Sequence, residues 1–156
     1  MLYALLKAVH VLSVILWVGG MLFAELFLRP ALAGLAPPER LRLAQAVLAR
    51  FFAAVLWASA LVFGSGVWMI GRVAKATVQS GGSFSMPLTW TVMAGLGMLM
   101  VVLFGYIRFA LYPRFAAAVA AADWTQAADR LQRLQLWVRV NLGLGLVILG
   151  VLYLAH

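Results

Sequence analysis

The chain has 156 residues, of which 66% are hydrophobic and only 10% are charged, and its mean hydropathy is +1.05. Soluble domains carry about 25% charged residues, so this composition excludes an ordinary water-soluble domain and indicates an integral membrane protein. The absence of cysteine excludes disulfides, thiolate-ligated clusters and covalent haem attachment through a C-x-x-C-H motif.

Four long uncharged runs predict four transmembrane helices within one domain, residues 1–156. We expect these spans at about residues 2–28, 50–71, 87–108 and 134–155, because roughly 20 apolar residues cross a bilayer as a helix. Pro87 suits the first turn of the third helix, where a missing N–H removes no hydrogen bond. The predicted fold class is all-α, a polytopic membrane protein built as an antiparallel bundle of four transmembrane helices.

The connections between the spans differ strongly in basic residues. One side of the membrane holds only Lys7, Arg72 and Lys75. The positive-inside rule therefore predicts cytoplasmic 1–2 and 3–4 connections and both termini outside, in a bacterial-type inner membrane. Anionic lipid headgroups of the bilayer account for the net charge of +8 without a nucleic-acid partner. The basic residues of the two cytoplasmic connections are Arg29, Arg40, Arg42, Arg50, Arg108, Arg114, Arg130, Arg133 and Arg139.

Both basic connections are predicted to be helical. Pro37-Pro38-Glu39 is a favourable helix opening that should run straight into the second span, and Asp123-x-x-Gln126 has the pattern of a capping box. The two halves of the chain share a plan, since each first span ends near a proline, at Arg29-Pro30 and Tyr112-Pro113. Both halves begin on the same side, so a repeat of this kind would have its axis along the membrane normal.

A polar stripe runs along the first span. At about 100° per residue, Lys7, His10, Trp17, Met21 and Glu25 fall within an arc of about 80°. Ser13 and Gly20 lie just beside this arc. Polar groups in hydrocarbon need partners, so the stripe should face other helices. His10, the only histidine inside a span, then either hydrogen-bonds across helices or holds a cofactor; the other histidine, His156, is terminal.

Two further polar positions need partners. Glu25 and Arg29 are spaced i, i+4 and can neutralise one another. Arg139 and Asn141 should face the bundle interior, because the fourth span needs that turn to reach across the membrane. We therefore expect Arg139 near Glu25.

The same residues resemble two known families. Leu6-Lys-Ala-x-His10, Trp17-x-Gly-Gly20 and Arg29-Pro30 resemble the first helix of CopD-domain (copper resistance D) membrane proteins. They are also similar to the first helix of HemJ-type protoporphyrinogen oxidases, in which a tryptophan follows a lysine and a histidine three residues apart. Trp137-Val-Arg-Val-Asn141 resembles the Arg-x-x-Asn stretch in the last helix of that second family, after a one-residue slip.

Three functions stay open at this point. The HemJ resemblance implies a b-type haem on His10 and a redox or porphyrin-related role, with Lys7 near a propionate and Trp17 packing near the ring. Oxidase activity itself is disfavoured, because the last-helix glutamate and proline of that family are replaced in Asn141-Leu-Gly-Leu. The CopD resemblance implies copper uptake or resistance, and the ligand preferences of Cu(I) leave open a site assembled between His10 and methionines of other helices. The third is a cofactor-free membrane scaffold; a homo-oligomer or a redox partner is compatible with each. The candidate cofactor-binding residues are His10, Lys7, Trp17, Ser13, Gly20, Arg139 and Asn141.

Overall fold

The computed structural model describes residues 1–154, and every regular element in that part of the chain is helical. The helical segments join into four continuous helices that are long and apolar enough to cross a membrane, Leu2–Ala33, Pro37–Gln79, Leu88–Ala120 and Trp124–Leu154. His156 lies outside the described residues. With η denoting a π-helical turn, the segments are α1 (Leu2–Val14), η1 (Ile15–Gly19), α2 (Gly20–Phe23), η2 (Ala24–Leu28), α3 (Arg29–Ala33), α4 (Pro37–Gln79), α5 (Leu88–Tyr106), η3 (Ile107–Leu111), α6 (Tyr112–Ala120) and α7 (Trp124–Leu154).

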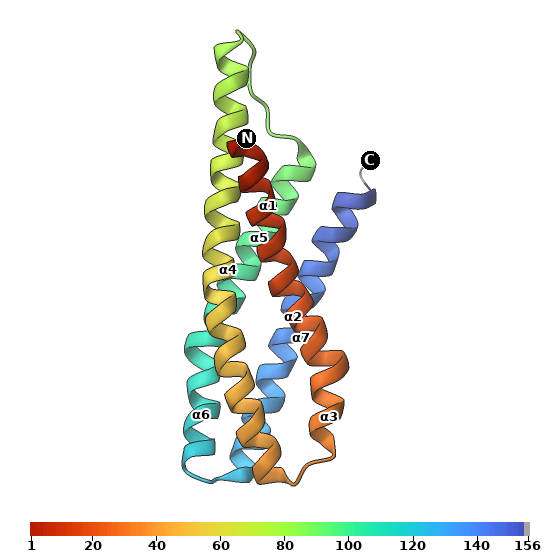
Figure 1. Ribbon diagram of the computed structural model, residues 1–156, viewed down its shortest axis with the longest axis vertical. Coiled ribbons are helices and arrows are strands. Elements are labelled where there is room, and N and C mark those ends of the chain that lie inside the picture. Colours follow the sequence, from red (N-terminus) through yellow and green to blue (C-terminus); the bar gives the residue numbers. More distant parts are fainter. Residues whose placement is uncertain (155–156) are drawn as a thin grey trace.

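The four helices run alternately up and down in an elongated bundle (Figure 1). α1 packs against α4, and α5 packs against α7. The tight connections 34–36 and 121–123 lie together at one end of the bundle, which we call the connection end. The loop 80–87 and both ends of the described chain point the other way, toward what we call the termini end. The predicted all-α, four-helix fold is confirmed.

Each helix extends beyond at least one predicted bound of its span. The first continues to Ala33 and the third to Ala120, while the second and fourth begin at Pro37 and Trp124. The predicted bounds followed charged residues, and a charge ends the hydrocarbon-facing segment without ending the helix. The predicted helices of both connections are accordingly confirmed as parts of α4 and α7. With 43 residues, α4 is about 65 Å long, about twice the thickness of a bilayer's hydrocarbon core, so it must project from the membrane.

The turn into α7 is closed by hydrogen bonds at both of its sides. Ala122 adopts a left-handed conformation with φ 55°, its N–H donates to the Val119 carbonyl, and the Asp123 N–H donates to the Ala118 carbonyl. This is a Schellman motif, in which glycine is the usual residue at the left-handed position. The Asp123 carboxylate then accepts the Gln126 N–H at 3.0 Å, so the predicted cap at the start of α7 is confirmed.

Both helices that contain an internal proline widen just before it. A proline ring clashes with the carbonyl four residues earlier, and for Pro30 and Pro113 those carbonyls lie within η2 and η3. The N–H groups that follow the two turns donate five residues back, from Arg29 to Ala24 and from Tyr112 to Ile107. A π-helical turn therefore accommodates each proline without ending the helix, at equivalent places in the two halves of the chain.

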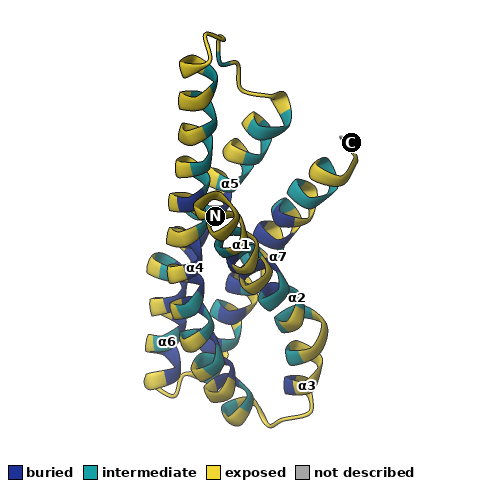
Figure 2. Cartoon of the chain, turned by 45° about the horizontal axis from the view of Figure 1, so that its top comes forward, coloured by how far each residue is buried: buried dark blue, intermediate teal, exposed yellow. Residues whose placement is uncertain are grey.

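Burial is concentrated in the middle and the connection-end half of the bundle (Figure 2). Within residues 1–154, no side chain of α4 is buried beyond Ser65, none of α5 before Met100, and none of α7 beyond Gly145. Toward the termini end the helices diverge, and their side chains are exposed or half-buried (Figures 1 and 2).

Candidate functional site

His10 lies between α1 and α4, against two small residues of α4. Its Nδ1 is 3.0 Å from the Ser65 hydroxyl. A Cβ placed on Gly66 would lie 3.4 Å from His10 Cε1, an ordinary van der Waals distance, so the imidazole packs directly against this position of α4. Ser65 is buried and His10 is half-buried. The interhelical hydrogen bond predicted as one alternative for His10 is therefore present.

The hydrogen bonds of Ser65 decide which ring nitrogen of His10 carries the proton. The Ser65 hydroxyl donates to backbone carbonyls one turn earlier, those of Leu61 and Val62. A hydroxyl has one hydrogen to give, so toward His10 it can only accept. With the hydroxyl hydrogen on those carbonyls, a neutral His10 donates from Nδ1–H and keeps the lone pair on Nε2. Metal-binding histidines are commonly oriented in this way, with the second ring N–H held by a neighbouring acceptor.

The polar stripe of the first span faces other helices, except at its first residue. Ser13, Trp17 and Met21 are buried, and the Trp17 ring meets Phe104 edge-on with centroids 5.7 Å apart. Gly20 lets α4 approach closely, since a Cβ there would lie 2.3 Å from the Phe51 ring. The expectation that the stripe faces other helices fails at Lys7, which is exposed because α1 has few neighbours near its start.

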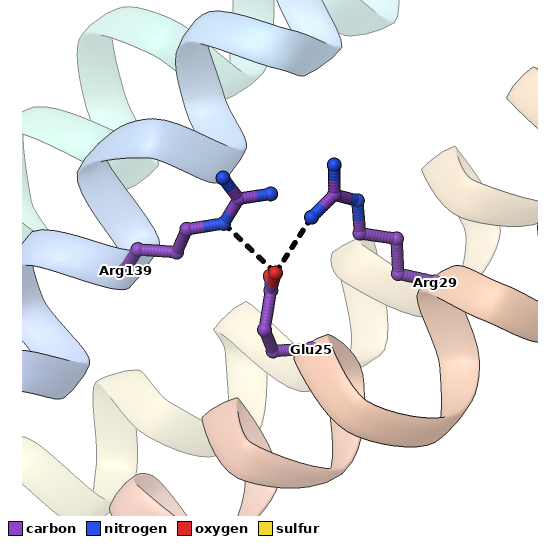
Figure 3. A network of polar contacts seen from close by, with 3 residues as sticks. All are labelled: Glu25, Arg29 and Arg139. Atoms are coloured by element: carbon purple, nitrogen blue, oxygen red, sulfur yellow. Dashed lines mark hydrogen bonds and ion pairs between the residues drawn. The ribbon is translucent and has the colours of Figure 1, made fainter.

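The charged residues of the first span meet a residue of the last one (Figure 3). Glu25 on η2 lies 2.7 Å from the Arg29 guanidinium and 2.8 Å from Arg139 Nε on α7. The Arg139 N–H is not aligned for a hydrogen bond, so the 2.8 Å contact is an attraction of charges. The predicted proximity of Arg139 to Glu25 is confirmed. The single carboxylate of Glu25 thus lies within ion-pair distance of two guanidinium groups, those of Arg29 and Arg139.

Asn141 lies deeper in the bundle and lacks a partner. Its side chain is 1% exposed, and neither atom of its amide has a hydrogen-bond partner. One turn further along α7, Gly145 packs against Val18 and Met100, which places this face of α7 in the bundle core. An amide buried without partners is unfavourable by about 1–3 kcal/mol. Asn141 therefore lowers the stability of the bundle core unless its amide binds another group.

The candidate residues form two separate groups. His10, Ser13 and Trp17 belong to the part of the first span nearer the termini end, whereas Arg139 is held by Glu25. Along a helix at about 1.5 Å per residue, His10 and Glu25 are about 22 Å apart. One small ligand therefore cannot contact both His10 and Arg139.

Sequence reasoning missed Ser65, the residue that hydrogen-bonds His10, although Gly66 beside it is one of the glycines from which close helix packing or space for a flat ligand is predicted. Gly64-Ser-Gly66 is the one place in the second span where a hydroxyl residue stands between two glycines, and small residues mark close helix contacts in membranes. That signal indicates a contact but does not name the helix on the other side.

The described residues, 1–154, contain no cluster of three or more His, Cys, Asp or Glu side chains of the kind that holds a metal ion. The sulfur donors are methionines, and Met69 lies one turn from Ser65 on the same face of α4. A soft ion such as Cu(I), which takes thioether and imidazole ligands, suits this donor set better than a hard divalent cation.

The fold and its composition define a multi-pass membrane protein whose only described histidine is held within the bundle. The family model described as Copper resistance protein D matches residues 45–155, well over half of the chain, so the chain belongs to the CopD family. The match begins in α4 and includes Ser65, Arg139 and Asn141, whereas His10 precedes it. No curated protein and no solved structure matches the chain.

Proposed function

We propose that this protein handles copper in the membrane, and that His10 Nε2 is a ligand for the ion. The observation that carries the proposal is the chain of hydrogen bonds from His10 through Ser65 to the α4 backbone, which leaves Nε2 free to coordinate. Membership of the copper resistance family supports copper as the metal. We further propose that the connection end, where basic residues are in excess, faces the cytoplasm of a bacterial-type inner membrane, which would put His10 in the outer half of the bilayer.

The donor set supports copper as a cargo rather than a permanent structural ion. One imidazole together with methionine thioethers binds Cu(I), and in the described residues His10 belongs to no group of three or more His, Cys, Asp or Glu side chains that could hold an ion permanently. A site with few protein ligands releases its ion readily, as uptake or resistance requires. The first helix, which carries His10, also carries Lys7, Ser13, Trp17 and Gly20. Arg139 and Asn141 on α7 form a second polar group, nearer the connection end.

The test uses purified, tag-free protein in mild detergent, titrated with Cu(I) against a competing chelator. His10→Ala should abolish binding. Ser65→Ala should weaken it by about tenfold or more, the usual effect of losing a partner that orients a ligating histidine. Ser59→Ala is the matched control, because Ser59 is also buried on α4 but its hydroxyl donates to its own helix at Leu56. Equal binding by wild type and His10→Ala would overturn the proposal.

A b-type haem on the same nitrogen is the second candidate function. The feature that favours it is the divergence of the helices toward the termini end, beyond the last buried residues of α4 and α7, together with the free Nε2. In that case Lys7, three residues from His10 and exposed, would be the cation for a propionate. An absorbance spectrum of protein produced with haem supply separates the two, since a Soret band lost in His10→Ala indicates haem. If the purified protein binds no copper and shows no Soret band, the remaining function is that of a cofactor-free membrane scaffold.

A further inference from the structure

A cavity of about 190 Å³ opens at the connection end of the bundle, between α3, α4 and α7. Four of the residues that line it carry side-chain hydrogen-bond donors, Arg29, Arg40, Gln132 and Gln135. Its apolar wall includes Leu41 and Leu131, which are themselves buried. No carboxylate lines it.

The cavity exists because the two halves of the bundle pack differently at this end. In the second half, α6 lies along α7 and buries Tyr112, Phe115, Ala118 and Val119. Its counterpart α3 buries only Leu32 and stands away from α7 (Figures 1 and 2). The space that α6 fills with aromatic and aliphatic side chains is left open beside α3, where arginine and glutamine line it together with leucine and alanine.

The charge of the cavity is not neutralised by the protein. Glu25, the carboxylate paired with Arg29, also faces Arg139, so these three residues together keep one positive charge. Arg40 forms no ion pair in the described part of the chain. Guanidinium groups with amide donors beside them are suited to phosphate oxygens, which they bind with charge-assisted hydrogen bonds.

We propose that this cavity binds the phosphate of an anionic phospholipid headgroup. Basic pockets between transmembrane helices at the cytoplasmic face bind such headgroups, and a cavity below the roughly 300 Å³ of usual small-molecule pockets holds a headgroup rather than an acyl chain. A lipid is favoured over a soluble phosphate because large apolar side chains are exposed beside the cavity. Leu26 precedes Arg29 by three residues and Leu136 follows Gln132 by four, spacings that put each on the same face of its helix as a lining residue, and these side chains are 60% and 56% exposed. They offer a surface along which acyl chains can lie.

The test measures lipid binding to the full-length protein by native mass spectrometry. Wild type should retain phosphatidylglycerol in preference to phosphatidylcholine with the same acyl chains. Arg40→Gln should weaken that binding by about tenfold or more, as expected for loss of a charge-assisted contact, and Arg29→Gln/Arg40→Gln further. The matched control is Arg114→Gln/Arg133→Gln, which removes two exposed charges at the same end outside the cavity, and it should bind like wild type.

Three outcomes would overturn the proposal. Equal retention of the two lipids would remove the requirement for an anionic headgroup. An equal loss in the Arg114→Gln/Arg133→Gln control would show a general effect of charge rather than a site. Inorganic phosphate that displaces phosphatidylglycerol from wild type at equal concentration would assign the cavity to a soluble anion. Because none of these measurements depends on copper or haem, their result is independent of the function of His10.

Discussion

The ion pair between Glu25 and Arg139 should stabilise the bundle, because it joins the first helix to the last one. Replacing Glu25 with Gln keeps the shape of the side chain and removes its charge. At 2.8 Å, and with an effective dielectric constant near 20, the gross attraction is about 6 kcal/mol. Most of that is offset by desolvation of the two charges.

The net effect follows from how far the charges are buried. Exposed ion pairs contribute about 0.2–1 kcal/mol, and breaking a fully buried pair by removing one partner costs about 3–5 kcal/mol. The Glu25 and Arg139 side chains are 24% and 40% exposed, and in a bilayer part of that surface meets lipid rather than water. We therefore expect Glu25→Gln to lower the free energy of unfolding by about 2 kcal/mol, between these limits.

The assay is a double-mutant cycle in mixed micelles, with unfolding by a denaturing detergent followed by circular dichroism. Arg139→Gln should cost less than Glu25→Gln, because Glu25 keeps Arg29 as a partner. The double variant should cost little more than Glu25→Gln alone, because only the more exposed Arg29 is then left without its carboxylate. Arg29→Gln is the control: its side chain is 48% exposed, and it should cost about 0.5 kcal/mol, like other i, i+4 pairs. Single-variant effects below about 0.5 kcal/mol that add in the double variant would refute the reasoning.

Three further predictions concern packing and polar groups. Gly20→Ala should destabilise by about 1–3 kcal/mol because its Cβ would overlap the Phe51 ring, whereas Gly19→Ala, with open space around it, should stabilise by about 0.5–1 kcal/mol; similar thermal shifts for both would contradict this. Ala122→Gly should raise the unfolding temperature slightly, because a left-handed conformation is unfavourable by about 1 kcal/mol for alanine, and a lower unfolding temperature would count against the motif. Asn141→Leu should stabilise by about 1 kcal/mol, since it removes an unpaired buried amide; a clear loss of stability in the same chemical unfolding assay would mean that the amide has a partner.

The sequence predicts the fold class well because the controlling signals are local. Uncharged runs mark the spans, Pro37 marks the start of α4, and Asp123 marks the start of α7. The helix ends are less predictable. The π-helical turn before Pro30 lets the first helix continue to Ala33, and nothing in the hydropathy pattern distinguishes a proline that ends a helix from one that a widened turn accommodates.

For the candidate site, the sequence predicts the residues contributed by the first helix but not their partners on α4. The stripe on the first span predicts that His10 faces another helix, but the partner, Ser65, is 55 residues away and follows from how α1 and α4 align. Charge predicts a partner more reliably than shape does. Few carboxylates in the chain could pair with Arg139, and Glu25 is the one at the same depth in the bilayer. For this reason the Glu25–Arg139 contact could be predicted from sequence and the His10–Ser65 contact could not.

The two halves of the chain share a backbone plan and differ in the chemistry placed on it. Glu25 and Arg108 are each the second residue of the π-helical turn before a proline. The two equivalent positions carry opposite charges. With opposite charges, Glu25 can pair with Arg139 of the other half, and the Arg108 guanidinium lies 5.5 Å from the centre of the Tyr112 ring.

The same alignment on the prolines matches His10 in the first half to Met93 in the second. The repeat thus offers an imidazole in one half and a thioether in the other, and these are the two donor types that copper accepts from a chain without cysteine. A symmetric repeat would have placed identical donors at both positions. If the protein handles copper as proposed, this asymmetry would give the ion one imidazole ligand and weaker thioether ligands, an arrangement that suits an ion in transit better than an ion held permanently.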